Sequence, residues 1–557
     1  MIQFVKNQLF SRKFLFSENL VLFFMTQKLL LGVEAIGQGA IDGGMSGVYA
    51  YPGTPSTEIT EYIQENEVAI ARNLHREWSA NEKTAMESAL GMSYAGKRAM
   101  VCMKHVGLNV AADPFINAAM TGINGGMIVT VADDPSMHSS QNEQDSRFYG
   151  KFAMIPILEP SNQQEAYDMT RTGFELSEKL GTPVLLRITT RLAHSRAGVI
   201  PVENAMAENK LSIPKDPRQF VLLPALARKR YQLLLDNQSK FEQASEDSPF
   251  NSLIDGKDKS LGIICCGIAL NYLMENYPDG CPYPILKVTQ YPLPSKMVKE
   301  LEQQVDKLLV IEEGYPLVEE QLKGFFDYGK KISGKLDGTL PRTGELNPDI
   351  VAKALNIKTT IGDPIPAMLA NRPPALCKGC GHHDSFKALS EVMSEYGDGH
   401  VFSDIGCYTL GVLPPYNSGN ACVDMGASVT MAKGAADAGL FPAVAVIGDS
   451  TFTHSGITGL LDAIYEKSNI LIMIGDNEST SMTGGQDSSA FGRIESICEG
   501  AGVDPQHIHV IEALPKNHEI LVDLIRLELA YKGVSIIIPR RECIQKSARR
   551  ISKNKNH

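Results

Sequence analysis

Two short polar motifs near the C-terminal end of the chain have the residue types of a metal and phosphate site. Gly448-Asp449-Ser450 and Gly475-Asp476-Asn477 each follow an apolar run, and the amphipathic segment Thr458 to Glu466 lies between them. This pattern predicts a strand, helix, strand unit with two parallel strands. Ligands bind at the carboxyl ends of such strands, so we expect Asp449 and Asn477 to meet there as oxygen ligands of Mg²⁺ beside a phosphate group.

The spacing of these motifs indicates which cofactor could bind there. Residues Thr451 to Gly475 place 25 positions between Gly-Asp-Ser and Asp-Asn. The arrangement is similar to the thiamine diphosphate signature, in which Gly-Asp-Gly/Ser is followed some two dozen residues later by Asn. The alternative is an ordinary crossover unit with Gly/Asp turns.

A carboxylate at the start of a helix is the second candidate for chemistry. Glu82 precedes a run of small residues, Lys83 to Ala95, that predicts a helix, so its side chain can project toward a bound ring. Glu77 and Glu87 are equally visible in the sequence. Any one of the three could instead be a solvated helix acid.

Two turns at predicted strand ends carry groups that bind anions. The turn Tyr51 to Ser56 places hydroxyls, Thr54 among them, at a helix start, where free N–H groups favour a carboxylate. A plain capped loop is the alternative. The turn Lys104 to Asn109 brings a cation, the His105 imidazole and an amide to another strand end. This concentration of polar groups is unusual for a structural turn.

The cysteines indicate metal, cluster or redox chemistry. Ten cysteines in 557 residues are too few for a disulfide scaffold, and a C-x-x-C pair favours such chemistry in a reducing compartment, by default the cytoplasm. Cys377, Cys380 and Cys407 could begin a four-thiolate iron–sulfur site with Cys543 as a distant fourth ligand. The alternative is a tight Gly-rich turn with buried thiols.

Length and charge limit the class of protein. A chain of 557 residues should hold about three or four domains. The net charge of −11 argues against a nucleic-acid-binding surface, and the apolar run Leu20 to Met25 is too short to span a membrane. We interpret residues 1–24 as an extension from an upstream start codon, with Met25 as the true start, and a weak signal or anchor as the alternative.

Longer motifs carry a family resemblance. The chain contains, in this order, YPGTPSTEI, EWSANEKTAMESALGMSYAGKRAM, MKHVGLNVAADP, VADDPSMHSSQNEQDSR, PALCKGCGHH, SDIGCYTLG, GDSTFTHSGITGL and DNESTSMTGGQ. It closely resembles the alpha subunit of indolepyruvate:ferredoxin oxidoreductase from about residue 27 to about residue 545, roughly nine tenths of its length.

The resemblance implies a thiamine diphosphate-binding fold of the α/β class. Two doubly wound parallel-sheet domains, of pyrimidine and diphosphate type, would be separated by a smaller transketolase C-terminal-like α/β domain. Glu312 and Glu313, at a predicted strand end of the smaller domain, are expected to make interdomain hydrogen bonds rather than to act in catalysis. The expected boundaries are 25–200 for the pyrimidine domain, 201–256 for a linker, 257–340 for the smaller domain, 341–372 for a second linker, 373–545 for the diphosphate domain and 546–557 for a disordered basic tail.

The resemblance also implies a reaction. An aromatic 2-oxo acid such as indole-3-pyruvate would be oxidatively decarboxylated on thiamine diphosphate, with the acyl group passed to coenzyme A and the electrons to ferredoxin. A smaller beta subunit would complete a hetero-oligomer. The alternatives are another 2-oxo acid, a non-oxidative thiamine diphosphate decarboxylase, or a non-catalytic partner subunit. Intact Asp449, Asn477 and Glu82 argue against the non-catalytic reading.

Site residues follow from the resemblance position by position. Glu82 would hydrogen-bond the aminopyrimidine ring, a task that favours a desolvated acid. Thr54 would bind the substrate carboxylate or keto oxygen, and Lys104 and His105 would stabilise charge on the substrate. The cofactor and metal set would comprise Asp449, Asn477 and the Ser479 backbone as Mg²⁺ ligands, with Gly448, Ser450, Gly426 and His382 beside the cofactor.

One departure from the family pattern concerns the route by which electrons leave the site. Members of this family commonly continue past Arg541-Glu542-Cys543 into a ferredoxin-like domain with two cysteine-rich runs, and this sequence contains neither run. Either Cys377, Cys380, Cys407 and Cys543 hold one [4Fe–4S] cluster, or a separate subunit carries the clusters, or the acceptor differs. The usual CPGCPH motif reads CKGCGH here, which keeps both thiols.

Overall fold

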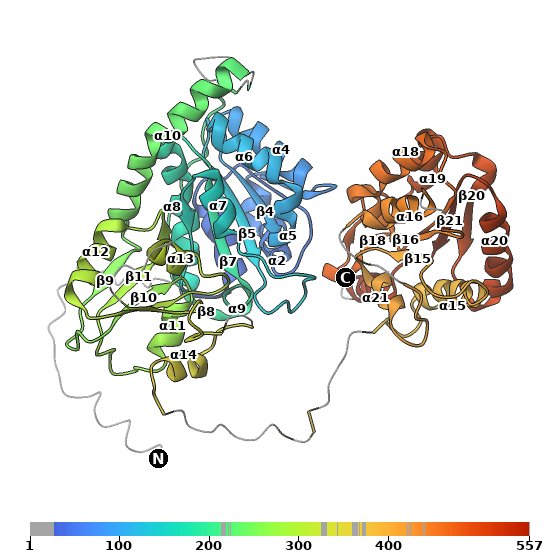
Figure 1. Ribbon diagram of the computed structural model, residues 1–557. Coiled ribbons are helices and arrows are strands. Elements are labelled where there is room, and N and C mark those ends of the chain that lie inside the picture. The colour runs from blue at the N-terminus through green and yellow to red at the C-terminus, as the bar shows by residue number, and fades with distance from the viewer. Residues whose placement is uncertain are drawn as a thin grey trace.

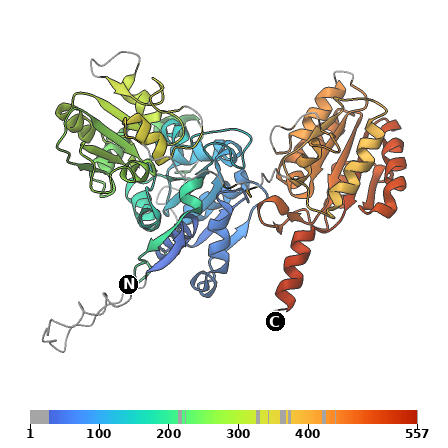
Figure 2. The same cartoon turned by 90° about the horizontal axis from the view of Figure 1, so that it is seen from below.

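The computed structural model contains three parallel-sheet units. It describes residues 27–212, 219–220, 222, 224–324, 331–341, 344–358, 366, 368–369, 375–419, 422, 425–437 and 440–555. The first unit (blue to cyan) lies between the second (green to yellow) and the third (orange to red) in both views (Figures 1 and 2). The α/β class expected from the sequence is confirmed.

The first sheet has seven strands with helices on both faces. Side chains alternate between the faces of a strand, so Met100 and Cys102 of β4 pack with α1, α2 and α8, whereas Val101 and Met103 pack with α4, α6 and α7. The sheet order is β12 (Gln290–Tyr291), β6 (Ile157–Leu158), β7 (Val184–Thr189), β5 (Met127–Asp133), β4 (Ala99–Lys104), β2 (Gly47–Ala50) and β3 (His75–Trp78), all parallel except β12.

The helices of this unit follow the strands in chain order. They are α1 (Gly32–Asp42), α2 (Thr57–Glu65), α3 (Glu67–Ala71), α4 (Glu82–Tyr94), α5 (His105–Val110), α6 (Ala112–Thr121), α7 (Arg147–Ala153), α8 (Gln163–Leu180) and α9 (Thr190–His194). The strands β1 (Lys28–Leu31) and β8 (Arg196–Val199) form a separate antiparallel pair. The long helix α10 (Pro224–Glu246) leads to the second unit.

The second sheet has five strands. Their order is β14 (Ile332–Ser333), β13 (Leu308–Ile311), β10 (Gly262–Cys266), β11 (Ile285–Val288) and β9 (Ser252–Ile254), with only β9 antiparallel. Its helices are α11 (Ala269–Met274), α12 (Ser295–Gln304), α13 (Leu317–Lys323) and α14 (Pro348–Ala354).

The third sheet has five parallel strands. Their order is β15 (Val401–Ser403), β16 (Val444–Gly448), β17 (Ile470–Gly475), β21 (Val534–Arg540) and β20 (Ile508–Glu512). One face is covered by α16 (Ala427–Asp437), α18 (Ile457–Tyr465) and α19 (Ile494–Ala501), and the other by α15 (Gly381–Met393) and α20 (His518–Ala530). The short elements are α17 (Asp449–Thr451), β18 (Ser479–Thr480) and β19 (Gln486–Asp487), and α21 (Ile544–Lys555) ends the unit.

Two buried arginines join the first and second sheets. Arg147 donates to Glu312 Oε2 at 3.0 Å, and the carbonyl oxygen of Glu313 accepts from both Arg147 and Arg187. Both guanidinium groups are fully buried, so each needs such partners to offset its lost hydration. The interdomain hydrogen bonds expected of Glu312 and Glu313 are therefore present.

Several local expectations differ from the structure. The expected first linker contains α10 and β9, and β9 pairs with β11, so the second sheet begins before residue 257. In the expected second linker, α14 packs on the second unit through Val351, because this apolar side chain completes its core. The tail expected to be disordered forms α21, whose Lys546 donates to the carbonyl of Glu478 at 2.7 Å. Residues 1–24 lie outside the described residues.

Among the helices of the described residues, none has the length and apolar character needed to cross a bilayer.

Candidate active site

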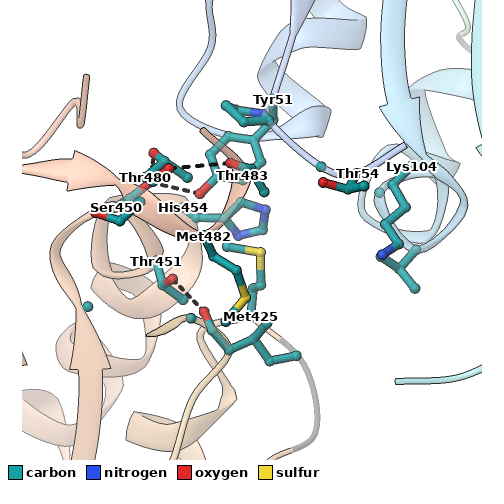
Figure 3. A pocket seen from close by; sticks show the side chains of 18 of the residues that line it. Tyr51, Thr54, Lys104, Met425, Ser450, Thr451, His454, Thr480, Met482 and Thr483 are labelled. Atoms are coloured by element: carbon teal, nitrogen blue, oxygen red, sulfur yellow. Dashed lines mark hydrogen bonds between the residues drawn. The ribbon is translucent and has the colours of Figure 1, made fainter. Parts of the chain in front are cut away.

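A cavity of about 300 Å³ lies between the first and third units. Its lining combines Thr54, Glu82 and Lys104 from the first unit with Asp449 and Asn477 from the third. Figure 3 shows Thr54 and Lys104 on one side of this space and Ser450, His454 and Thr480 on the other. Sequence segments almost 400 residues apart thus form one pocket, since the Tyr51 hydroxyl lies 2.8 Å from that of Ser450.

The two polar motifs meet as the spacing predicts. Gly448 of β16 is in register with Gly475 of β17, which brings the residues after them to the same sheet edge. The Ser479 N–H lies 3.1 Å from Asp449 Oδ2 and 3.2 Å from Asn477 Oδ1. Because both oxygens approach one nitrogen, they converge on a small volume. This donor set of hard oxygens fits a magnesium ion.

The charge state of Asp449 supports a cation at this point. Burial raises the pKa of the Asp449 carboxyl to about 7, and neighbouring Asp476 adds to the shift. A carboxylate that is buried beside a second acid lacks a compensating positive charge. A divalent ion would supply that charge and keep Asp449 ionised.

Hydroxyl groups extend the site from the metal motif toward the first unit. Ser450 Oγ lies 2.8 Å from the Tyr51 hydroxyl and 2.9 Å from Thr480 Oγ1. Such hydroxyls can donate to phosphate oxygens. The part of the cavity beside Asp449 therefore suits a diphosphate.

Glu82 lines the same cavity from the first unit. It is the first residue of α4, whose start is capped because Asn81 Oδ1 accepts from the Thr84 N–H at 2.8 Å. A side chain at residue 107 would collide with Glu82, because a Cβ there would lie 2.5 Å from Glu82 Oε1. Gly107 thus makes room for the carboxylate. Glu77 lies on β3, and Glu87 is an exposed residue that pairs with Lys83.

His454 is a site residue that sequence reasoning missed. Its Nε2 lies 2.7 Å from Glu82 Oε2, and its carbonyl accepts from Asn81 Nδ2 at 2.9 Å. Residues Phe452–Gly456, which include His454, form a π-helical segment between α17 and α18. Such segments interrupt α-helices at functional sites. The signal that the sequence offered was the position of His454, in the helical segment that follows the Gly448-Asp449-Ser450 motif.

The two cationic candidates differ in position. Lys104 lines the cavity, where Nζ donates to the Ser139 carbonyl at 2.6 Å, and burial lowers the pKa of its ammonium to about 8. His105 is buried outside the cavity lining, with Nε2 3.2 Å from the carbonyl of Asn142. The structure therefore brings Lys104, but not His105, to the cavity wall.

Gly426 and His382 do not line this first cavity but lie behind the residues that do. The Gly426 N–H donates to Asp404 Oδ1 at 2.8 Å, and a Cβ there would lie 2.4 Å from Ser455 Cβ. His382 Nε2 lies 3.4 Å from Asn477 Nδ2, and burial lowers the pKa of its imidazole to about 4. Both residues therefore support the loops that carry the cavity lining.

Four cysteines line a second, smaller cavity. Cys377, Cys380, Cys407 and Cys543 surround about 80 Å³, and Cys407 also lines the first cavity. Among the described residues no three of these sulfurs lie within 4.8 Å of one another. Burial raises the pKa of the Cys407 thiol to about 12, and the other three thiols add to it. The set fits an iron–sulfur cluster, which binds thiolates.

Two family models match the units that form the cavity. Residues 38–234 match "Pyruvate flavodoxin/ferredoxin oxidoreductase, thiamine diP-bdg", and residues 404–526 match "Thiamine pyrophosphate enzyme, C-terminal TPP binding domain". The fold and the site together define a thiamine diphosphate-binding protein of the 2-oxo acid oxidoreductase class.

Whole-chain similarity identifies the family within that class. The chain is 40% identical over 543 residues to the indolepyruvate oxidoreductase subunit IorA of Archaeoglobus fulgidus, covering 92% of this chain and 86% of that one. The IorA subunit of Pyrococcus abyssi is 38% identical over 561 residues, with 92% and 85% covered. The chain therefore belongs to the IorA family of indolepyruvate oxidoreductase subunits, as its motifs suggested.

A solved structure shows a weaker likeness. A 2-oxoglutarate:ferredoxin oxidoreductase from Magnetococcus marinus aligns with 59% of this chain and 65% of its own, at 16% identity and a TM-score of 0.49.

Proposed function

We propose that the chain is the thiamine diphosphate-binding subunit of an enzyme that oxidatively decarboxylates an aromatic 2-oxo acid of the indole-3-pyruvate class. The acyl group passes to coenzyme A and the electrons pass to ferredoxin. One observation carries the proposal: Glu82 of the first unit and Asp449 and Asn477 of the third unit line the same cavity.

The chain's own residues divide the work of cofactor binding. Asp449 and Asn477, with the backbone at Ser479, would hold Mg²⁺ and the diphosphate, while Glu82 would hydrogen-bond the aminopyrimidine ring. Bound thiamine diphosphate supplies the carbanion and the electron sink for decarboxylation. His454 keeps the Glu82 carboxylate in a fixed orientation and can exchange a proton with it at 2.7 Å.

The substrate end of the cavity combines a cationic and an apolar part. Thr54 and Lys104 offer a hydroxyl and an ammonium to a carboxylate or keto oxygen, whereas Met425 and Met482 line the cavity beside His454 (Figure 3). Methionine side chains adapt to aromatic rings and contact them favourably through sulfur. This pairing supports an aromatic 2-oxo acid.

We further propose that the four cysteines hold one [4Fe–4S] cluster that takes up the electrons. The cavity that they line shares Cys407, Asn477 and Ser481 with the substrate cavity, so the two sites are in contact. A smaller beta subunit would complete the enzyme. Free thiols and a thiolate cluster suit a reducing compartment, and we therefore place the enzyme in the cytoplasm.

The function is tested with the chain co-purified with its beta subunit under anaerobic conditions. Indole-3-pyruvate, pyruvate, 2-oxoglutarate and a branched-chain 2-oxo acid are compared in coenzyme A-dependent reduction of ferredoxin. We expect the highest kcat/KM with indole-3-pyruvate and no turnover without thiamine diphosphate. Release of the aldehyde without electron transfer would instead establish the non-oxidative decarboxylase, and thiamine-independent behaviour would contradict the proposal.

The cluster is tested separately by iron and sulfide analysis. We expect about four iron atoms per chain, and their loss in Cys380→Ser. The half-buried Cys281 of the second unit provides the matched control, since Cys281→Ser removes a thiol outside the quartet. If the wild-type chain contains no iron, the cluster that accepts the electrons must belong to another subunit.

A further inference from the structure

A third group of ligating side chains lies at the outer edge of the third sheet. His507 immediately precedes the edge strand β20, His509 is the second residue of that strand, and Glu528 belongs to α20. His507 Nδ1 lies 2.9 Å from Glu528 Oε2, and His509 Nε2 lies 2.7 Å from Glu528 Oε1. The three ligand atoms all lie within 4.8 Å of one another. None of these residues lines the two cavities described above.

We propose that His507, His509 and Glu528 form a binding site for a borderline divalent metal ion such as Zn²⁺. Two imidazole nitrogens and one carboxylate oxygen make up a ligand set that zinc uses in proteins. Zinc binds tightly to such nitrogen and oxygen donors, whereas Mg²⁺ prefers oxygen ligands and retains its water.

The burial of Glu528 points to a positive charge at this place. Its side chain is 1% exposed, and its ion-pair partners in the described chain are the two histidines. Neutral imidazoles can each donate one N–H to the carboxylate but bring no net charge. A buried carboxylate without a counter-charge is unfavourable, and a divalent ion removes that cost.

The geometry leaves room for an ion and for its approach. Ligand atoms about 2.0 to 2.1 Å from a tetrahedral zinc ion lie roughly 3.3 Å apart, so each imidazole needs to withdraw from the carboxylate by only about half an ångström. The side chains of His507 and His509 are 23% and 27% exposed, which allows this movement and leaves a face for water. The ring of His507 is also stacked on Tyr531, at a centroid distance of 3.4 Å.

An ion at this site would stabilise the edge of the third unit. Among the described strands, β20 is the last of the sheet and is hydrogen-bonded on one side only, to β21. The metal would connect this strand to α20, which covers the sheet. Because the three ligands come together only in the folded chain, the binding free energy of the ion would add to the stability of the fold.

The site is tested by zinc binding to the full-length protein after dialysis against a chelator. The four-cysteine cavity can also take up zinc, so the decisive quantity is the difference between variants that keep those cysteines. We expect His509→Gln to bind about one zinc ion fewer per chain than wild type. His518→Gln should bind as wild type does, because His518, the first residue of α20, pairs with Glu391 of α15 and lies outside the trio. Equal zinc content in wild type and His509→Gln would overturn the proposal.

Two further measurements keep the test independent of folding. Glu528→Gln removes the carboxylate charge with little change of shape and should lose the same ion. In Co²⁺-loaded protein, the difference spectrum between wild type and His509→Gln should show ligand-field bands without thiolate charge transfer. Thiolate bands in that difference would assign the lost ion to cysteines and contradict the site.

Discussion

The Nε2 atom of His454 lies 2.7 Å from Oε2 of Glu82, although the two residues belong to different units and are 372 positions apart. The contact is reinforced by the Asn81 side chain, which donates to the backbone carbonyl of His454. The proposed catalytic carboxylate is therefore oriented by the unit that binds the diphosphate. Correct docking of the two units and correct placement of Glu82 depend on the same contacts.

The first prediction concerns the Glu82 carboxylate. Glu82→Gln keeps the size of the side chain but removes its basicity, so we expect kcat to fall by about 10²- to 10⁴-fold. Binding of thiamine diphosphate, followed by calorimetry, should change much less. Glu87→Gln on the exposed side of the same helix is the control and should leave kcat unchanged. A Glu82→Gln enzyme with normal kcat would refute the assignment.

His454 should act on the rate through Glu82. Loss of a hydrogen bond to a charged group costs about 1.5 to 3 kcal/mol, or roughly ten- to a hundredfold in rate. We therefore expect His454→Ala to lower kcat by this factor while KM changes little, and the hydrogen-bonding His454→Gln to recover part of the loss. If Glu82→Gln and the double variant differ by the full His454 effect, the two residues act independently and the positioning role is wrong.

Much of the architecture was predictable because buried parallel strands are apolar on both faces. The strand, helix, strand unit expected around Gly448 and Gly475 is present as β16, α18 and β17. The segments around α10, α14 and α21 were harder to interpret because they are charged, and they become ordered by packing on other parts of the chain. Val351 of α14, for example, joins the core of the second unit, a long-range contact that no local pattern reveals.

The site was predictable where chemistry and local spacing coincide. Asp449 and Asn477 follow neighbouring strands, so their convergence follows from the crossover rule. The four cysteines span 166 positions from Cys377 to Cys543, and only the fold brings Cys407 and Cys543 to the C-x-x-C pair. His454 was missed because its partner lies in another unit.

Lys104 should make substrate binding depend on pH. Burial lowers the pKa of its ammonium to about 8, with a smaller opposing effect of Asp134. The group is charged below that pH and neutral above it, so attraction of the substrate carboxylate weakens as the pH rises. We expect KM for the 2-oxo acid to increase above about pH 8 in wild type. In Lys104→Met, KM should be roughly ten- to a hundredfold higher and should lack this step.

A matched lysine separates this effect from general charge. Lys83 is exposed and pairs with Glu87, so Lys83→Met should keep the wild-type KM profile. If KM depends on pH in Lys104→Met as it does in wild type, Lys104 does not bind the substrate.

The buried Asp449 carboxyl, which the cofactor site needs in its ionised form, should lower the free energy of unfolding when it is ionised. The pKa of its carboxyl in the folded chain is about 7, raised by burial and by Asp476 from the ordinary value of 3.8. Between these pH values the folded chain retains a proton that the unfolded chain has lost, so the free energy of unfolding decreases as the pH rises from about 4 to 7. The full effect, at most about 4 kcal/mol at roughly 1.4 kcal/mol per unit, applies above pH 7.

Asp449→Asn removes this titration and one metal ligand together. In the absence of Mg²⁺ and thiamine diphosphate we expect the variant to have a higher Tm than wild type at pH 8 and a smaller advantage at pH 5. With both ligands added, only wild type should gain stability, because the metal takes the place of the proton on Asp449. Asp462→Asn, an exposed change on α18, should behave as wild type throughout. Scanning calorimetry at the two pH values checks the prediction, and an equal Tm difference at pH 5 and pH 8 would show that Asp449 is ionised in the folded chain without its cation.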